Sequence, residues 1–169
     1  MLPAPAAEAA STTKVNFDVA NAPCSFNGTI ALRRYKTTTF TGPTVDGGGA
    51  ILGECASFGV TGHSPPNFLA FNLALLADGG SAMAPEKITF PKKVRLVKVK
   101  AGSASGGDIT MEAFRGPDGT GTSLGSSTLM MGSAVAALKI QKGRNLIKSV
   151  VISTPTNNFV LDDLVTTRG

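Results

Sequence analysis

KVRLVKVKAGSASGGDITMEAFRGPDGTGTSLGSSTLM, residues 93–130, decides the fold class. Short runs of alternating apolar and polar side chains are separated by glycine-rich breaks. Alternation with a period of two is the pattern of a strand that buries one face, and Gly-Pro-Asp-Gly at 116–119 is typical of a tight turn. This stretch therefore predicts short strands joined by turns, without helices between them.

The same spacing continues on both sides of this stretch. In Val94, Leu96, Val97 and Val99 the apolar phase flips, which indicates a β-bulge or a strand buried on both faces. Regularly spaced short strands are typical of a sandwich or barrel, and we predict an all-β, jelly-roll-like sandwich of two antiparallel sheets. The expected strands are 14–19, 29–36, 50–52, 55–60, 67–72, 86–90, 93–100, 108–115, 122–131, 135–141, 146–153 and 158–167.

Length and composition agree with one such domain. The chain has 169 residues, 42% of them apolar, so it can bury a core. Only 16% are charged and 20 are glycine, a balance that suits turns and strands better than helices. We predict a β-sandwich domain over residues 14–169, preceded by a Pro/Ala-rich arm or linker at residues 1–13.

The net charge of +5 lies mainly in two basic clusters, residues 33–36 and 92–100. Basic stripes can neutralise phosphates, but the chain has no Trp, a single Tyr and no recognised nucleic-acid motif. In the second cluster the basic residues alternate with Val and Leu, as on a solvated strand face. We therefore do not expect nucleic acid as a partner. No apolar run is long enough to predict a membrane span.

Catalytic chemistry is not supported by any motif. His63 is the single histidine and lies in a Gly/Pro loop, and no serine lies in a Gly-x-Ser-x-Gly elbow. We expect a protein that is not an enzyme. Cys24 and Cys55 lack the CxxC spacing of a metal or redox site. Either they form one disulfide, as the export-like composition favours, or they are two separate buried thiols.

Two stretches resemble a known family. Residues 49–72, which include SFGVTGHSPPNFLAFN, and NFVLDDL at 158–164 resemble bacterial exported β-sandwich domains. Many such domains carry a PEP-CTERM type sorting tail. They also look like jelly-roll carbohydrate-binding modules, which implies lectin-like glycan binding at the cell surface or outside the cell. The aromatic candidates for a glycan are Tyr35, Phe40 and Phe114.

In the resembled jelly rolls, a structural calcium ion often lies between the first strand and the last. The matching positions are Asp18 and Asp162, with Asp163 as a lesser candidate, because hard cations take carboxylate oxygens. Neighbouring residues of a strand point to opposite faces, so only one of the two adjacent aspartates should face inward. The alternative is that Asp162 accepts hydrogen bonds from backbone or hydroxyl groups.

Two functions remain open on the sequence alone. The first is a non-catalytic extracellular carbohydrate-binding domain. The second is a structural subunit of a surface layer, filament or capsid-like shell, which would join neighbouring subunits, including copies of itself, through its N-terminal arm and strand edges. The absence of Trp, the usual platform for stacking a sugar, favours the second function, and the family resemblance favours the first.

Overall fold

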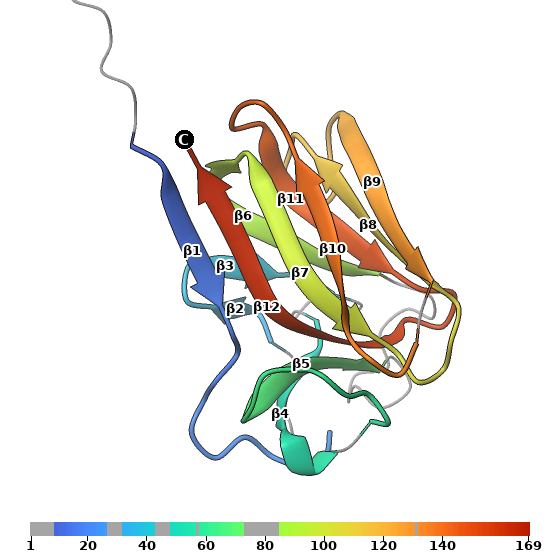
Figure 1. The fold of residues 1–169 in the computed structure, drawn as a ribbon. Helices are drawn as coiled ribbons and strands as arrows, with labels where there is room; N and C mark the ends of the chain where they lie inside the picture. The colour runs from blue at the N-terminus through green and yellow to red at the C-terminus, as the bar shows by residue number, and fades with distance from the viewer. Residues whose placement is uncertain (1–8, 27–31, 43–47, 57, 73–84, 131) are drawn as a thin grey trace, which may run out of the picture.

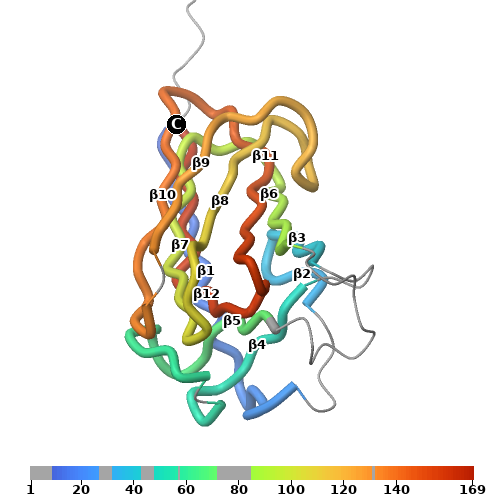
Figure 2. Tube along the Cα trace, turned by 90° about the vertical axis from the view of Figure 1, so that its right-hand side faces the viewer, coloured from blue at the N-terminus to red at the C-terminus, as the bar shows by residue number. Residues whose placement is uncertain are grey.

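The computed structural model describes residues 9–26, 32–42, 48–56, 58–72, 85–130 and 132–169. Two six-stranded sheets pack face to face, and every strand pair within them is antiparallel (Figures 1 and 2). The predicted all-β sandwich of two antiparallel sheets is confirmed.

The first sheet is ordered β10-β7-β12-β5-β4, and β1 also pairs with β12. The long strand β12 organises this sheet, because its first half pairs with β5 and its second half with β1, while β7 lies along its other side. Figure 1 shows β1 beside the C-terminal end of β12. The strands are β1 (Ser11–Val15), β4 (Ala50–Gly53), β5 (Asn67–Asn72), β7 (Leu96–Gly102), β10 (Ala136–Gln141) and β12 (Asn158–Arg168).

The second sheet is ordered β2-β3-β6-β11-β8-β9. A one-turn 3₁₀ helix, η1 (Glu54–Ala56), follows β4 of the first sheet. It is too short to cross a membrane, and no other helix in the described ranges could do so. The strands are β2 (Arg34–Tyr35), β3 (Thr38–Phe40), β6 (Glu86–Val94), β8 (Asp108–Phe114), β9 (Ser123–Met130) and β11 (Ile147–Ser153).

The core lies between the sheets and is built by strand alternation. In β8, for example, Ile109, Met111 and Ala113 are fully buried, and the residues between them point outward. Phenylalanines fill the largest spaces: Phe71 stacks on Phe159 with ring centroids 4.8 Å apart. Apolar area removed from water is the main stabilising contribution in such a core.

Three expectations need correction. The phase flip between Val94 and Leu96 marks a change of sheet: β6 ends at Val94, the chain bends at Arg95, and β7 starts at Leu96 in the other sheet. A register shift between β6 and β11 lies just before it, between Thr89 and Val94. Of the strand expected at 55–60, residues 55 and 56 belong to η1, residue 57 lies outside the described residues, and residues 58–60 form no strand. The first strand begins at Ser11, three residues inside the expected arm, and ends at Val15 before Phe17, which adopts a positive φ of 59°. The expected strand at 29–36 falls partly outside the described residues.

Candidate functional site

A cleft opens at one edge of the sandwich, where β1 and β12 of the first sheet face β3 and β6 of the second. Its volume is about 320 Å³, at the lower end of the range of about 300–1,000 Å³ for small-molecule sites. It can therefore hold a small ligand or the end of a longer one. The described residues that line it are Ser11, Thr13, Thr37, Thr38, Phe90, Pro91, Lys92, Val94, Thr166 and Arg168.

The cleft exists because the inward-facing positions of two paired strands change from apolar to polar. Val15 pairs with Leu164, and both are buried in the core. Toward the start of β1 and the end of β12, the next pair on the same face is Thr13 with Thr166, and the one after it is Ser11 with Arg168. Side chains two apart share one face of a strand. The core thus ends at Val15, and a polar wall continues beyond it.

The opposite wall comes from β6 and the approach to β3. Phe90 and Val94 are almost fully buried and form an apolar floor, while Pro91 and Lys92 are exposed. Arg168 spans the two sheets, because its Nε donates a hydrogen bond to the carbonyl of Lys93, at 3.3 Å. The walls therefore combine an apolar surface with hydroxyl and cationic groups.

None of the lining residues within the described ranges is Asp, Glu, His or Cys. Hydrolysis of a glycosidic bond ordinarily needs two carboxyl groups that face each other across the bond. The described walls supply hydroxyl groups that can both donate and accept hydrogen bonds. These groups can bind a polar ligand.

The three aromatic residues expected to contact a glycan do not form one surface: Tyr35 and Phe40 both pack on Phe17, whereas Phe114 lies on the outer face of the second sheet. Phe40 is completely buried in the core against Phe17, so the prediction that it contacts a ligand is wrong. Phe40 cannot reach a ligand because it lies opposite Ile88 on the inward face of the second sheet. Tyr35 is half-buried: its ring stacks on Phe17 with centroids 5.7 Å apart, and its hydroxyl donates to the carbonyl of Asp18.

Phe114 lies on the outer face of the second sheet and is partly covered by the turn that follows β8. Gly119 of this turn lies close to the Phe114 ring. Two hydrogen bonds fix the turn on the sheet: the amide of Asp118 donates to Thr89 Oγ1, and the amide of Gly119 donates to Ser149 Oγ, both at 3.0 Å. The Phe114 ring is therefore only partly exposed.

The two adjacent aspartates of β12 lie close to Ser64 in the loop before β5. Asp162 is fully buried, and it accepts hydrogen bonds from the amide and hydroxyl of Ser64 and from the amide of Asp163. Burial raises the pKa of Asp162, and these hydrogen bonds partly oppose the rise. The hydrogen-bonding alternative therefore accounts for this buried carboxyl group.

Asp163 binds two lysines on the outer face of the first sheet. Its carboxylate lies 2.7 Å from Lys14 Nζ and 2.8 Å from Lys100 Nζ. Burial alone would raise the pKa of Asp163, but the hydrogen bonds from the two lysines outweigh that effect and lower it. In a regular strand, Asp162 and Asp163 would point to opposite faces of the sheet. Here a register shift in β12 and a positive φ of 48° at Asp163 interrupt that alternation of side chains.

The carboxylates predicted to bind calcium do not form a cluster. Asp18 accepts a hydrogen bond from the Asn16 amide group, and its Oδ1 is buried without a donor. In the described ranges, no three His, Cys, Asp or Glu side chains are placed to share a metal ion. The donors around Asp162 and the lysines beside Asp163 fit hydrogen bonding better than a cation. Calcium at Asp18 and Asp162 stays a prediction.

A second depression, of about 440 Å³, lies beside His63. His63 packs on Phe68 with ring centroids 4.6 Å apart, and its Nδ1 is 4.0 Å from the Glu54 carboxylate. The other described lining residues are Gly59, Val60, Thr61 and Gly62, so the walls offer mainly backbone.

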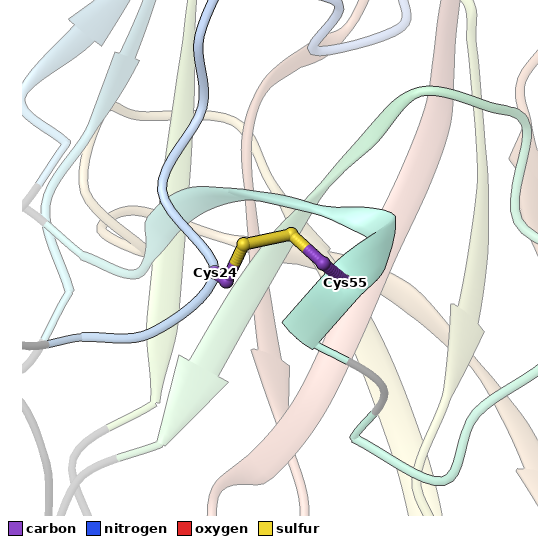
Figure 3. The surroundings of a disulfide bond; sticks show 2 residues. All are labelled: Cys24 and Cys55. Carbon is purple, nitrogen blue, oxygen red and sulfur yellow. A yellow bond between two sulfur atoms is a disulfide. The ribbon is translucent and has the colours of Figure 1, made fainter.

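The predicted disulfide is confirmed: Cys24 is bonded to Cys55 of η1 (Figure 3).

Solved structures of similar shape come from two kinds of domain. The K1 cleaved adhesin domain of Lys-gingipain from Porphyromonas gingivalis W83 has a TM-score of 0.54 and 13% identity, covering 94% of this chain and 99% of that one. The K2 cleaved adhesin domain of Lys-gingipain has a TM-score of 0.53 and 14% identity, covering 94% and 99%. A family 29 carbohydrate-binding module from Piromyces equi, CBM29_1, has a TM-score of 0.50 and 9% identity, covering 96% and 93%.

The likeness establishes the fold. This is a β-sandwich of the kind found in adhesin domains and carbohydrate-binding modules. No protein-family model matches the sequence, and no curated protein matches it. The expected link to PEP-CTERM proteins stays a prediction.

The cleft was missed in the sequence because serine and threonine in a strand are typical of a solvated face. One signal was available. Thr13 and Ser11 continue the inward phase of Val15, and Thr166 and Arg168 continue that of Leu164. Recognising it required knowing that the first and last strands pair.

Proposed function

We propose that this protein is a non-catalytic, extracellular carbohydrate-binding domain, and that the cleft at the β1/β12 edge is its binding site. The composition of the cleft carries the proposal. Sugars present apolar C–H faces and a rim of hydroxyl groups, and the cleft has an apolar floor below side chains that donate and accept hydrogen bonds. The fold shared with a carbohydrate-binding module supports this proposal.

The disulfide supports the extracellular part of the proposal. Disulfides persist in oxidising compartments and are rare in the reducing cytosol. Here both cysteines are exposed to solvent in addition to being bonded. A bond in such a position would be open to reductants inside the cell.

The test places a large side chain in the cleft and compares its effect on binding with that of the same substitution at the neighbouring residue of β1. Thr13 lines the cleft, whereas Thr12 lies on the outer face of β1, 3.3 Å from Thr167 Oγ1. Wild type, Thr13→Phe and Thr12→Phe should be run by affinity electrophoresis against a panel of soluble polysaccharides. We expect at least one polysaccharide to retard the wild type and Thr12→Phe, and the Thr13→Phe variant to lose at least tenfold in affinity.

Absence of binding by the wild type across neutral and charged polysaccharides would overturn the proposal. Equal loss in Thr12→Phe and Thr13→Phe would remove the cleft as the site. Release of reducing ends from a bound polysaccharide would contradict the non-catalytic assignment.

A second candidate function is assembly into a surface layer, filament or shell. One observation favours it: in the described sheets β1 has a partner, β12, along one side only. The other side of an edge strand can pair with a strand of another subunit. Light scattering over a range of protein concentrations tests this candidate, because discrete assemblies would support it and a monomer throughout would count against it.

A further inference from the structure

From the charges around the cleft, we infer that it selects anionic sugars, meaning uronates or sulfated sugars, over neutral ones. The inference rests on the proposed function, because it names the class of glycan that the same site would take. It is carried by two cationic side chains, one on each wall, in a cleft whose described walls contain no acidic residue.

The two cations approach the cleft from different sheets. Lys92 is exposed at the end of β6, and no ion pair or hydrogen bond within the described part of the chain engages its ammonium group. Arg168 lies at the end of β12, where its hydrogen bond to the Lys93 carbonyl fixes the guanidinium beside the cleft. A guanidinium can donate two parallel hydrogen bonds to a carboxylate or sulfate.

Four acidic residues described in the structure have partners away from the cleft. Asp162 and Asp163 bind Ser64 and two lysines, Asp118 accepts a hydrogen bond from Thr41, and Glu112 accepts one from Ser123. None of these carboxylates lines the cleft. The described walls of the cleft therefore carry two cationic side chains and no carboxylate.

The apolar floor strengthens this preference. Phe90 and Val94 exclude water from one side of the cleft, and a charge interaction grows stronger as the surrounding dielectric constant falls. Hydroxyl groups of Thr13 and Thr166 can bind ring hydroxyls, which a simple inorganic anion lacks. A volume of about 320 Å³ suits a charged sugar unit or the end of a chain better than a nucleic acid strand.

The experiment compares charged and neutral forms of the same sugars by isothermal titration calorimetry. The probes are tetragalacturonic acid with its fully methyl-esterified form, and a sulfated galactan oligosaccharide with its desulfated form. The first pair tests carboxylate and the second tests sulfate. We expect at least one charged probe to bind tenfold or more tightly than its neutral partner.

Matched variants separate the site from general attraction to a basic protein. Lys92→Gln and Lys139→Gln remove the same charge, but Lys139 lies on the outer face of β10, far from the cleft in strand order. We expect Lys92→Gln to reduce the preference for the charged probe at least threefold and Lys139→Gln to leave it unchanged. Arg168→Gln should act like Lys92→Gln, with melting curves confirming that it folds.

Each outcome decides between the two proposals. Equal binding of charged and neutral probes overturns the inference and leaves the proposed function standing. No binding of any probe or polysaccharide overturns both. Equal losses in Lys92→Gln and Lys139→Gln overturn the inference in favour of unspecific charge attraction, as would tighter binding of a single-stranded oligonucleotide than of either charged oligosaccharide.

Discussion

The carboxyl group of Glu86 is completely buried at the start of β6, and no described residue donates a hydrogen bond to it. It lies against the backbone of Gly42 and Gly48, where a side chain on Gly48 would come within 1.9 Å of Glu86 Oε2. Burial disfavours the charged form and raises the pKa of Glu86 well above its usual value. The folded protein therefore holds this carboxyl group in its neutral form over a wider pH range than the unfolded chain does.

This burial makes the stability of the fold depend on pH. Below about pH 4, Glu86 is protonated in both states and imposes no cost. As the pH rises, the unfolded chain releases its proton first, so the free energy of unfolding falls until the raised pKa of the folded state is passed. The Glu86→Gln variant has no ionisable group at this position, so it does not show this loss of stability. In urea unfolding we expect the variant to gain at least about 1 kcal/mol on the wild type between pH 4 and pH 8.

Glu112→Gln is a suitable control, because Glu112 lies on the outer face of β8. Its stability relative to the wild type should change little over the same pH interval. If the gain of Glu86→Gln is the same at both pH values, Glu86 is not the source of the pH dependence.

At the scale of the element, β1 buries only the side chain of its last residue. Val15 is 2% exposed, while residues 11–14 are exposed. We compare a chain that starts at Ser11 with one that starts at Asn16. The second chain loses the burial of Val15 and the pairing of β1 with β12. It should therefore be less stable by about 2 kcal/mol or more in urea unfolding.

Equal stability of the two chains would show that β1 contributes little to the fold. A large loss already in the chain that starts at Ser11 would instead place the stabilising contacts before β1. Light scattering on the same two chains then shows whether β1 also governs assembly.

The strands that could be predicted from the sequence are those with a clear alternation, such as β8, or a compact apolar run, such as β5. Residues 67–72 match β5, and 108–115 and 158–167 differ from β8 and β12 by one residue at one end. The corner at Arg95 was misread, because a strand that changes sheet shows the same phase flip as a bulge. β1 was placed too late because its residues 11–14 bury no apolar side chain.

At the scale of the whole molecule, the candidate site depends on pairings that no local pattern contains. Ser11 and Arg168 are adjacent only because the first and last strands pair in one register. The wall opposite them comes from β6, in the other sheet. A shift of one residue in that register would turn Thr13 and Ser11 to the outer face. The sequence could therefore predict the sandwich, but it could not predict where its edge opens.

The disulfide acts on the molecule as a whole, because it restrains the unfolded chain as well as joining two loops. Cys24 and Cys55 are 31 residues apart. Closing a loop of this length lowers the entropy of the unfolded chain, and this raises the free energy of unfolding by about 3–4 kcal/mol at room temperature. The double variant Cys24→Ser, Cys55→Ser should lose a free energy of unfolding of this size in urea. The wild type treated with reductant should lose the same amount. A loss below about 1 kcal/mol in both would mean that contacts, and not the covalent closure, hold the segment between β1 and η1.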